Sequence, residues 1–303
     1  MPHLWPSLSL DDWQDTCTTL HLWTQIVGKI RLVQTPWMNH SWHVPLYLTA
    51  RGLTTGTIPH DDQIFQIDCD FFDHQLRIVT SAGQERSVAL QPRTVADFYQ
   101  AVMTALVELG VAVRIHTTPN EIPDAIPFEQ DDIHGAYDAE AAQRFWRVLL
   151  QSDRVFHEFR SHFCGKVSPV HFFWGSFDLA VTRFSGRSAP PHPGGVPNLP
   201  DDVAQEAYCQ EVSSAGFWPG TGLGYPAFYS YAYPVPEGFK DATVQPEAAF
   251  FHEGLGEFVL PYEAVREADD PDQALLGFLH STYEAAAELA GWDVAGLKQT
   301  WFK

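Results

Sequence analysis

The chain has 303 residues, of which 45% are hydrophobic and 14% aromatic, and this composition predicts a packed globular protein rather than a disordered one. Only 18 basic residues stand against 38 acidic ones, a formal net charge of −20, which argues against nucleic acid and anionic membranes as partners because both are bound through basic patches. No run approaches the ~20 apolar residues that span a bilayer, and the N-terminus lacks a signal-peptide pattern, so we expect a cytoplasmic protein.

The four cysteines are scattered, and no two of them form a Cys-x-x-Cys pair. They are Cys17, Cys69, Cys164 and Cys209. In a cytoplasmic protein such cysteines usually stay reduced and act as small hydrophobic residues. The spacing therefore favours neither a disulfide nor a thiolate metal site.

Residues 1–116 are predicted to form a first half with the order helix, four antiparallel strands, helix. Apolar residues recur at helical spacing in the two outer segments and in strand-like patterns between them. The predicted elements are a helix at 11–33, strands at 42–50, 64–71, 74–80 and 86–90, and a helix at 94–109. A short strand at 111–115 is also expected, ahead of a proline-rich, acidic connector at 117–138.

Residues 139–303 repeat the same order and form the second predicted half. The predicted elements are a helix at 139–164, strands at 170–184, 207–214, 227–233 and 257–260, and a helix at 271–290. The segment 186–202 is rich in proline and glycine, and we expect it to be the least ordered loop of the chain.

The two halves also share local sequence features. A Gly-Lys pair ends a helical run in each half, at residues 28–29 and 165–166. A tryptophan then precedes an arginine by nine residues in both halves, as Trp42 and Arg51 and as Trp174 and Arg183. These matches predict an internal duplication.

A duplicated unit of this kind predicts one pseudo-symmetric α+β body. Strands joined by hairpins and followed by helices give an antiparallel sheet with helices on one face. Two such units in succession suggest a pseudo-twofold saddle like that of the TATA-binding protein, although the acidity argues against DNA as its partner. The alternative is a helix-grip fold, in which a sheet curls around a long helix.

Two segments resemble a known bacterial family of uncharacterised proteins, the domain-of-unknown-function family 5996. They are residues 165–187 and 42–47, and the resemblance extends over nearly the whole chain, from Trp5 to Trp292. The family brings no assigned activity. Its pattern places a histidine just before the glutamate of a Tyr-x-x-Glu-Val stretch, whereas this chain has Gln210 there. Any chemistry of that histidine is therefore in doubt for this chain.

Histidines and carboxylates at strand ends are the first candidate site. His40 and His43 precede the first long predicted strand, His171 precedes its counterpart, and Asp178 and Glu211 lie within apolar strands. A buried carboxylate is costly unless it is paired or binds a cation. We therefore predict His171, Asp178 and Glu211 as catalytic groups, with a divalent metal at His40, His43 and His171 as one version. The alternative is that these are structural polar residues.

Basic residues at matching places are a second candidate. Lys29, Lys166, Arg51 and Arg183 could frame an anion pocket from both halves. They could also neutralise the ends of helices or pair with buried carboxylates, and ion pairing is the interpretation that the burial of charge favours.

Aromatic residues supply a third candidate. Trp42, Trp174 and Trp218 are predicted to contact a small ligand, with the glycine-rich loop 213–225 as a lid. The competing interpretation packs these rings into the core. The loop is not a phosphate-binding motif, and the chain has no Gly-x-Ser-x-Gly elbow.

Two functional hypotheses follow from these candidates. The first is an enzyme that acts on a small molecule in a cleft between the halves through His171, Asp178 and Glu211, with or without a metal. The second is a module that binds a small ligand or a partner protein without chemistry. Metal content and the openness of the cleft would separate them.

Overall fold

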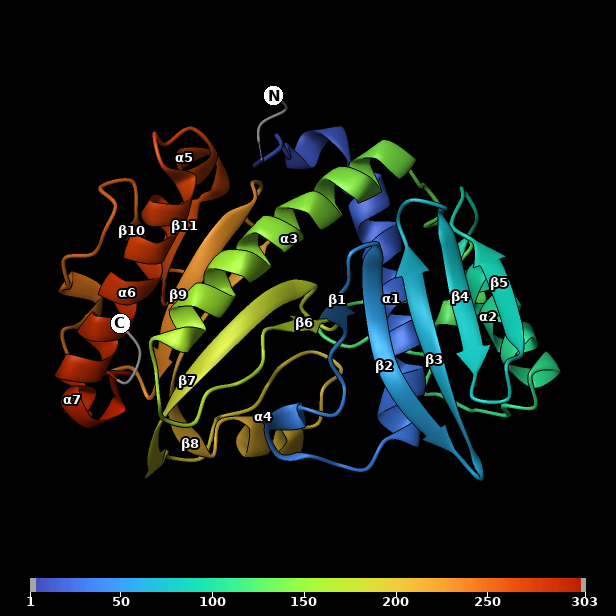
Figure 1. Cartoon of the computed structure of the whole chain (residues 1–303), viewed down its shortest axis with the longest axis horizontal. Helices are drawn as coiled ribbons and strands as arrows, with labels where there is room; N and C mark the ends of the chain where they lie inside the picture. Colours follow the sequence, from blue (N-terminus) through green and yellow to red (C-terminus); the bar gives the residue numbers. More distant parts are fainter. Residues whose placement is uncertain (1–3, 301–303) are drawn as a thin grey trace.

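The first part of the chain forms a five-stranded antiparallel sheet with a helix before it and a helix after it. The computed structural model describes residues 4–300. Its elements here are η1 (Leu10–Asp12), α1 (Gln14–Gln34), η2 (Asn39–Ser41), β1 (Tyr47–Leu48), β2 (Gly52–His60), β3 (Gln63–Asp70), β4 (Gln75–Thr80), β5 (Glu85–Ala89), α2 (Val95–Glu108) and η3 (Phe128–Gln130). The strands pair in sequence order, from β1 at one edge to β5 at the other (Figure 1).

The second part forms a six-stranded antiparallel sheet with the order β10-β11-β9-β8-β7-β6. Its elements are α3 (Ala139–Ser161), β6 (His171–Phe173), β7 (Asp178–Ser188), α4 (Asp201–Ala207), β8 (Gln210–Trp218), β9 (Ala227–Tyr233), η4 (Phe239–Asp241), β10 (Phe250–His252), β11 (Glu257–Pro261), α5 (Tyr262–Arg266), α6 (Pro271–Leu289) and α7 (Val294–Leu297). Mixed helices and antiparallel sheets confirm the predicted α+β class.

Several predicted strands were wrong in extent. β2 was missed because Gly52–His60 contains two glycines and a proline, and its pairing with β3 is interrupted by a bulge between Thr54 and Thr57. The predicted strand at 42–50 is mostly turn and keeps only β1. The predicted strand at 170–184 is two strands, β6 and β7, joined by a turn. Residues 111–115 form no strand.

The two sheets meet through one pair of residues at their edges. The amides of Leu46 and Phe172 each donate to the other's carbonyl, and both N···O distances are 2.9 Å. Both side chains are buried in the core that the helices cover. Alternation carries the same face onward to Leu48 and its partner Leu53 in one sheet and to Leu179 in the other. All four long helices therefore belong to one face of the joined sheet.

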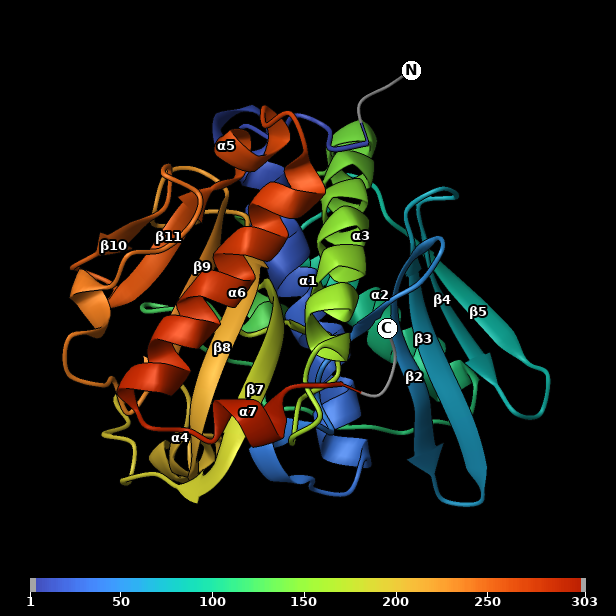
Figure 2. The same ribbon diagram turned by 60° about the vertical axis from the view of Figure 1, so that its left-hand side comes forward.

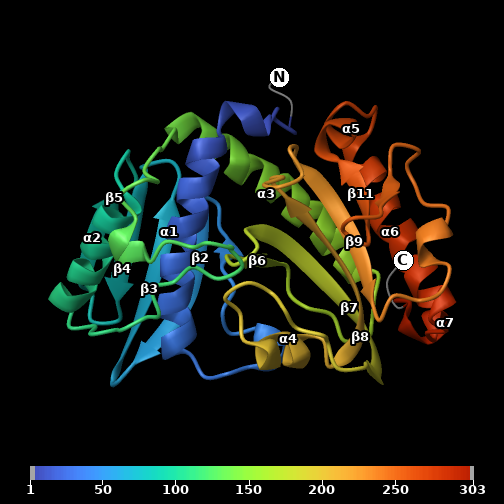
Figure 3. The same ribbon diagram turned by 180° about the vertical axis from the view of Figure 1, so that it is seen from behind.

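Because the joined sheet is twisted, no single view shows this common face along its whole length. Figure 1 shows α3 and α6 in front of the six-stranded sheet and α1 and α2 behind the five-stranded one, and Figure 3 shows the reverse from the back. Adjacent strands rotate by roughly 20–25° relative to one another, so the same face of a long sheet turns toward opposite sides at its two ends. Figure 2 shows α1 and α3 meeting between the two sheets.

Gly28 is a notch in α1 rather than the end of a helix. The helix continues to Gln34, and a Cβ on Gly28 would lie 2.2 Å from ring atoms of Trp174. The Trp174 indole N–H donates to the Val44 carbonyl at 2.9 Å, so the ring links α1 to the chain on both sides of the sheet junction.

The predicted residue-by-residue alignment of the two halves was therefore wrong in detail. The Gly-Lys pair at 28–29 lies inside α1, whereas the pair at 165–166 follows the end of α3. Trp42 precedes β1, but Trp174 follows β6. The matching residues therefore occupy different places in the two halves.

We expect substitutions of two helical glycines to have opposite effects. Gly28→Ala would force the Trp174 ring to move, so overpacking should lower the free energy of unfolding by about 1–3 kcal/mol. Gly277→Ala in α6 meets nothing closer than 3.9 Å and should gain up to ~1 kcal/mol from helix propensity. Urea titrations of the two variants and the wild type measure both values. Equal effects of the two substitutions would contradict this account of Gly28.

Candidate functional site

Tyrosines gather on the face of the six-stranded sheet that the long helices leave uncovered. Along β9, Phe228 packs into the core, so alternation directs Tyr229, Tyr231 and Tyr233 to the opposite face. The rings of Tyr229 and Tyr231 stack, with centroids 6.1 Å apart. Small residues lie beside them on β8, where Ser214 pairs with Tyr231 and Gly216 pairs with Tyr229. This face looks toward the viewer in Figure 3.

A long segment before β8 lies against these tyrosines. The Tyr233 hydroxyl donates to the Pro190 carbonyl at 3.0 Å, and the hydroxyls of Tyr208 and Tyr231 lie 2.7 Å apart. The imidazole of His192 stacks on Tyr208 with a centroid distance of 4.7 Å. We call Tyr208, Tyr229, Tyr231 and Tyr233 the tyrosine cluster.

Asp178 is the buried carboxyl of this cluster. It is the first residue of β7 and is only 7% exposed. The Tyr229 hydroxyl donates to its Oδ2, and the Tyr229 side chain passes over Gly216, where a Cβ would lie 2.4 Å from that hydroxyl. Among residues 4–300, no other residue donates a hydrogen bond to Oδ1. A buried polar atom without a partner is rare enough to call for an explanation.

Burial keeps the Asp178 carboxyl protonated at pH values well above those at which an aspartate usually ionises. Desolvation raises the pKa of Asp178 to about 7, the nearby carboxylates of Glu121 and Glu257 add to the rise, and the hydrogen bond from Tyr229 opposes it. Desolvation also raises the pKa of Glu257, the first residue of β11, to about 7. The pKa of Glu121 is raised by burial too, although the Ser176 hydroxyl donates to it. Three carboxyls with raised pKa values, those of Asp178, Glu121 and Glu257, therefore lie close to the tyrosine cluster.

His171 lies on the same face as Asp178 but does not touch it. It pairs with Ala180, two residues from Asp178 on β7, so the two side chains are diagonal neighbours on the hairpin. The imidazole is fully buried, and its ring centroid lies 6.0 Å from that of Trp42 and 5.6 Å from that of Tyr47.

The His171 imidazole is neutral and lacks hydrogen-bond partners. Burial, reinforced by the positive charges of Arg31 and Arg160, lowers its pKa to about 3. Neither ring nitrogen has a hydrogen-bond partner within the described part of the chain. The acceptor nitrogen and the donor nitrogen of this neutral ring are therefore both left unused.

Glu211 does not join these groups. It lies on β8 with a side chain 18% exposed, and it forms an ion pair with Arg187 at 2.7 Å. The Arg187 guanidinium also donates to the carbonyls of Ala290 and Gly291 just after α6. Glu211 therefore ties the end of α6 to the sheet, and the structure brings only two of the three predicted catalytic groups onto one face.

The four predicted anion-binding residues lie in different environments. Arg51 is 52% exposed and pairs with Asp70 at 2.6 Å, and the Lys29 ammonium donates to the Thr118 carbonyl at 2.8 Å. Arg183 is buried with its guanidinium 3.4 Å from the ring centroid of Phe159, and burial lowers its pKa to about 9. These three groups do not share a pocket.

Two of the three predicted tryptophans lie on the face of Asp178. Trp174 is buried against Gly28, as described above. Trp218 is half-buried at the end of β8, and the pairing of Leu179 with Phe217 places it beside Asp178 across the two strands. Trp42 lies beside His171 and Phe184, with centroids 6.0 and 5.9 Å away, and this places it on the same face as Asp178.

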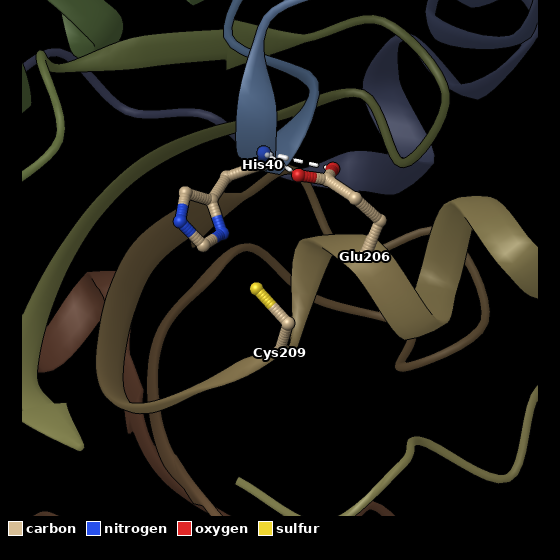
Figure 4. Close-up of side chains that lie close together, drawn as sticks. All are labelled: His40, Glu206 and Cys209. Atoms are coloured by element: carbon tan, nitrogen blue, oxygen red, sulfur yellow. Dashed lines mark hydrogen bonds between the residues drawn. The ribbon is translucent and has the colours of Figure 1, made fainter. Parts of the chain in front are cut away.

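The three histidines of the predicted metal site do not form one group of ligands. His43 accepts from the Met38 amide at 3.2 Å and packs on Trp37. His171 is enclosed by aromatic rings. Within residues 4–300, the one group of three metal-ligating side chains is His40, Glu206 and Cys209 (Figure 4).

Sequence reasoning missed Glu206 and Cys209. A strand was predicted from residue 207, whereas α4 ends there, so the Glu-x-x-Cys spacing around a helix end went unused. The contact with His40 spans more than 160 residues, and no local pattern reveals it.

The chain is a two-sheet α+β protein. The tyrosine cluster and its carboxyls lie on the face of the six-stranded sheet that the long helices leave uncovered, and His40, Glu206 and Cys209 form a separate group before β8. The chain belongs to the family of unknown function DUF5996, whose model matches residues 5–299. No curated protein and no solved structure matches the chain. Among the described helices, none is both long and apolar enough to cross a membrane.

We predict that Asp178→Asn changes how stability depends on pH. The folded-state pKa of about 7 exceeds the usual 3.8, so the unfolded chain ionises first and the wild type loses stability as pH rises through this window. Asparagine cannot ionise and still accepts from Tyr229. Relative to the wild type, the variant should gain about 2 kcal/mol between pH 5.5 and pH 8. Urea unfolding at both pH values measures the difference, and parallel pH profiles would rule out an elevated Asp178 pKa.

Proposed function

We propose that the chain is an enzyme that acts on a small organic cation at the tyrosine cluster, with Asp178 as its acid–base group. The observation that carries this proposal is the buried Oδ1 of Asp178, which accepts no hydrogen bond from another described residue. A carboxyl with a pKa of about 7 is present in both protonation states near neutral pH, which is the condition for efficient general acid–base catalysis.

The surrounding groups favour a positively charged ligand. Tyrosine rings attract cations over their faces, and aromatic cages of this kind hold ammonium groups. The acidic groups nearest to Asp178 are Glu121 and Glu257, so an arriving cation would offset the loss of hydration, and the smaller repulsion, that raise the pKa of Asp178. An anionic ligand would increase that repulsion.

The proposed chemistry is proton transfer. Ionised Asp178 would accept a proton from the ligand, and neutral Asp178 would return it. The Tyr229 hydroxyl, which already donates to Oδ2, would stabilise the carboxylate once it forms. His171, on the same face with unpartnered ring nitrogens, offers a second neutral acceptor, which retains part of the His/carboxylate hypothesis.

We also infer that the two halves are copies of one unit arranged as a saddle like that of the TATA-binding protein. The order α1, β1 to β5, α2 corresponds to α3, β6 to β9, β11, α6, with β10 as an addition at the edge. The Leu46–Phe172 pair would lie at the pseudo-twofold axis. The tyrosine cluster would then be a specialisation of the second copy, because β4 carries Arg77 and Val79 in place of tyrosines.

A cytoplasmic location fits this proposal. Cys164 and Cys209 are exposed free thiols, and such thiols persist in a reducing compartment.

Ligand screening with matched variants tests the proposed binding. We expect small organic amines, and not carboxylates of similar size, to raise the melting temperature of the wild type, by several degrees at saturating concentrations. Asp178→Asn and Tyr229→Phe should weaken this response roughly tenfold or more in apparent affinity, since each removes a charge or hydrogen bond at the site. Tyr99→Phe, at a tyrosine of the first half whose ring centroid lies 6.2 Å from that of Phe128, is the matched control.

Isotope exchange then separates catalysis from binding. An amine that binds and carries a C–H next to a carbonyl, which can take up the electron pair, should exchange that hydrogen for deuterium in D2O in the presence of the wild type, and Asp178→Asn should abolish this exchange. Binding without exchange for every ligand would support the alternative, a non-catalytic binding module. Unchanged affinity in both site variants would refute the site itself.

A further inference from the structure

Lys166, the fourth of the predicted anion-binding residues, is held by a histidine rather than by a carboxylate. Its side-chain nitrogen lies 2.5 Å from His40 Nε2 and 3.0 Å from Gln210 Oε1. Among the described residues it forms no ion pair, whereas the Lys240 ammonium pairs with Glu253 at 3.6 Å. In a chain with 38 acidic residues, a half-buried lysine without a carboxylate partner calls for an explanation.

The His40 imidazole is oriented as a proton acceptor for this lysine. Its Nδ1 lies 2.9 Å from the Ala207 carbonyl, which can only accept, so Nδ1 carries the ring proton and Nε2 presents its lone pair to Lys166. Burial lowers the pKa of His40, and the charge of Lys166 lowers it further, so the ring is neutral. An amine, a base and a group that orients the base are the parts of an activated nucleophile.

The same orientation argues against a metal ion between His40 and its neighbours in Figure 4. One atom from each of His40, Glu206 and Cys209 lies within 4.8 Å of the other two. The imidazole nitrogen on that side is Nδ1, which donates to the Ala207 carbonyl, so no ring lone pair is directed at the carboxylate or the thiol. The acceptor nitrogen of this ring faces Lys166 instead.

The main chain of His40 is held as firmly as its side chain. Both carboxylate oxygens of Glu206 accept from the His40 amide at 2.9 Å. His40 and Ser41 have φ angles of 58° and 56°, in the left-handed region that non-glycine residues rarely adopt. Such strain is kept where the surroundings over-determine it, and it is concentrated at functional sites.

Aromatic rings lie against the Lys166 nitrogen as well. It is 4.6 Å from the ring centroid of Phe184 and 5.6 Å from that of Trp42. Burial lowers the pKa of Lys166, although Cys209 and Glu206 act in the opposite direction. The neutral amine is therefore more abundant here than for a lysine in water, and a lysine becomes a nucleophile in this form.

The neutral form of Lys166 has its lone pair free. A neutral amine carries two N–H groups, and His40 Nε2 and Gln210 Oε1 are placed to accept from both. Lys166 and Gln210 are half-buried rather than buried, so a small molecule can reach the nitrogen from solvent.

We propose that Lys166 binds small aldehydes or ketones covalently as an imine, with His40 as the proton carrier. The amine lone pair adds to the carbonyl carbon, and the C=O π pair moves to the oxygen. His40 Nε2 passes two protons in turn from the nitrogen to that oxygen, one on addition and one on expulsion, and the oxygen leaves as water. A C=N bond thus replaces the C=O bond without any oxidant or reductant, and hydrolysis reverses the reaction.

The surroundings favour a carbonyl compound with an aromatic or apolar body and no negative charge. Trp42 and Phe184 offer ring surface beside the amine, and Glu206 is close enough to influence the charge of Lys166. A carboxylate on the ligand would be repelled there. Phe184 is six residues along β7 from Asp178, or about 20 Å at the rise of a strand, so this site is separate from the tyrosine cluster.

Reductive trapping on the full-length chain tests this site. With benzaldehyde and sodium cyanoborohydride at neutral pH, Lys166 should form the stable N-benzyl adduct at least roughly tenfold faster than Lys240, as measured by peptide mass spectrometry. Lys240 is the internal control, because 55% of its side chain is exposed and unspecific reaction reaches it readily. A rate at Lys166 equal to or below that at Lys240 would overturn the proposal.

A pair of matched variants tests the role of the imidazole. His40→Asn suits the left-handed backbone but lacks Nε2, so trapping at Lys166 should slow by roughly tenfold or more while trapping at Lys240 stays unchanged. His74→Asn is the control, because His74 also has a positive φ but contacts Tyr137 instead, and both rates should stay as in the wild type. Equal rates at Lys166 in the two variants would contradict the role of His40. The probe is a neutral aldehyde, so neither result bears on amine binding at the tyrosine cluster.

Discussion

The pairing of Leu46 with Phe172 is the interaction on which the rest of the molecule depends. Two hydrogen bonds join the edges of the two sheets there, and both side chains are buried beneath the helices. The pair sets which face of each sheet meets the core, because a shift by one residue would reverse the face of every side chain beyond it. The bare face with Asp178 and the tyrosines is the consequence of that register. The insertion of Trp174 into the notch at Gly28 fixes the same junction from the helical side.

Local patterns predicted the elements whose own sequence decides their structure. The strand at 227–233 was predicted to the residue, because tyrosines alternate there with small or buried residues. The helix α2 was also predicted closely, since the Thr94 hydroxyl accepts from the Asp97 amide as an N-cap. β2 was missed because its stability comes from pairing on both sides rather than from its residues. The alignment of the two halves failed because a Gly-Lys pair occurs both inside α1 and after the end of α3, and two residues do not specify either place.

The candidate site was predictable only where a single residue carried the signal. Asp178 stood out because a carboxyl in an apolar strand is costly, and the structure places it under a tyrosine that is 51 residues away in the chain. Nothing in the local sequence identifies Tyr229 as that partner, because the contact depends on Gly216 leaving room for the ring. The same limit applies to His40 and Glu206, whose contact links the two halves. Burial costs can be inferred from sequence, but the groups that offset them depend on the tertiary fold.

The acidity of the tyrosine cluster explains why such a site would be both costly and useful. Because Asp178 is buried, and Glu121 and Glu257 lie close to it, the folded chain resists an ionisation that the unfolded chain undergoes freely, so the cluster weakens the fold at neutral pH. A cation that binds there reverses the preference, because it stabilises the carboxylate form and is bound only by the folded chain. Binding would then release a proton and restore the stability that the empty site lacks. An apolar sheet face would avoid the cost, but it could neither attract a cation nor transfer its proton.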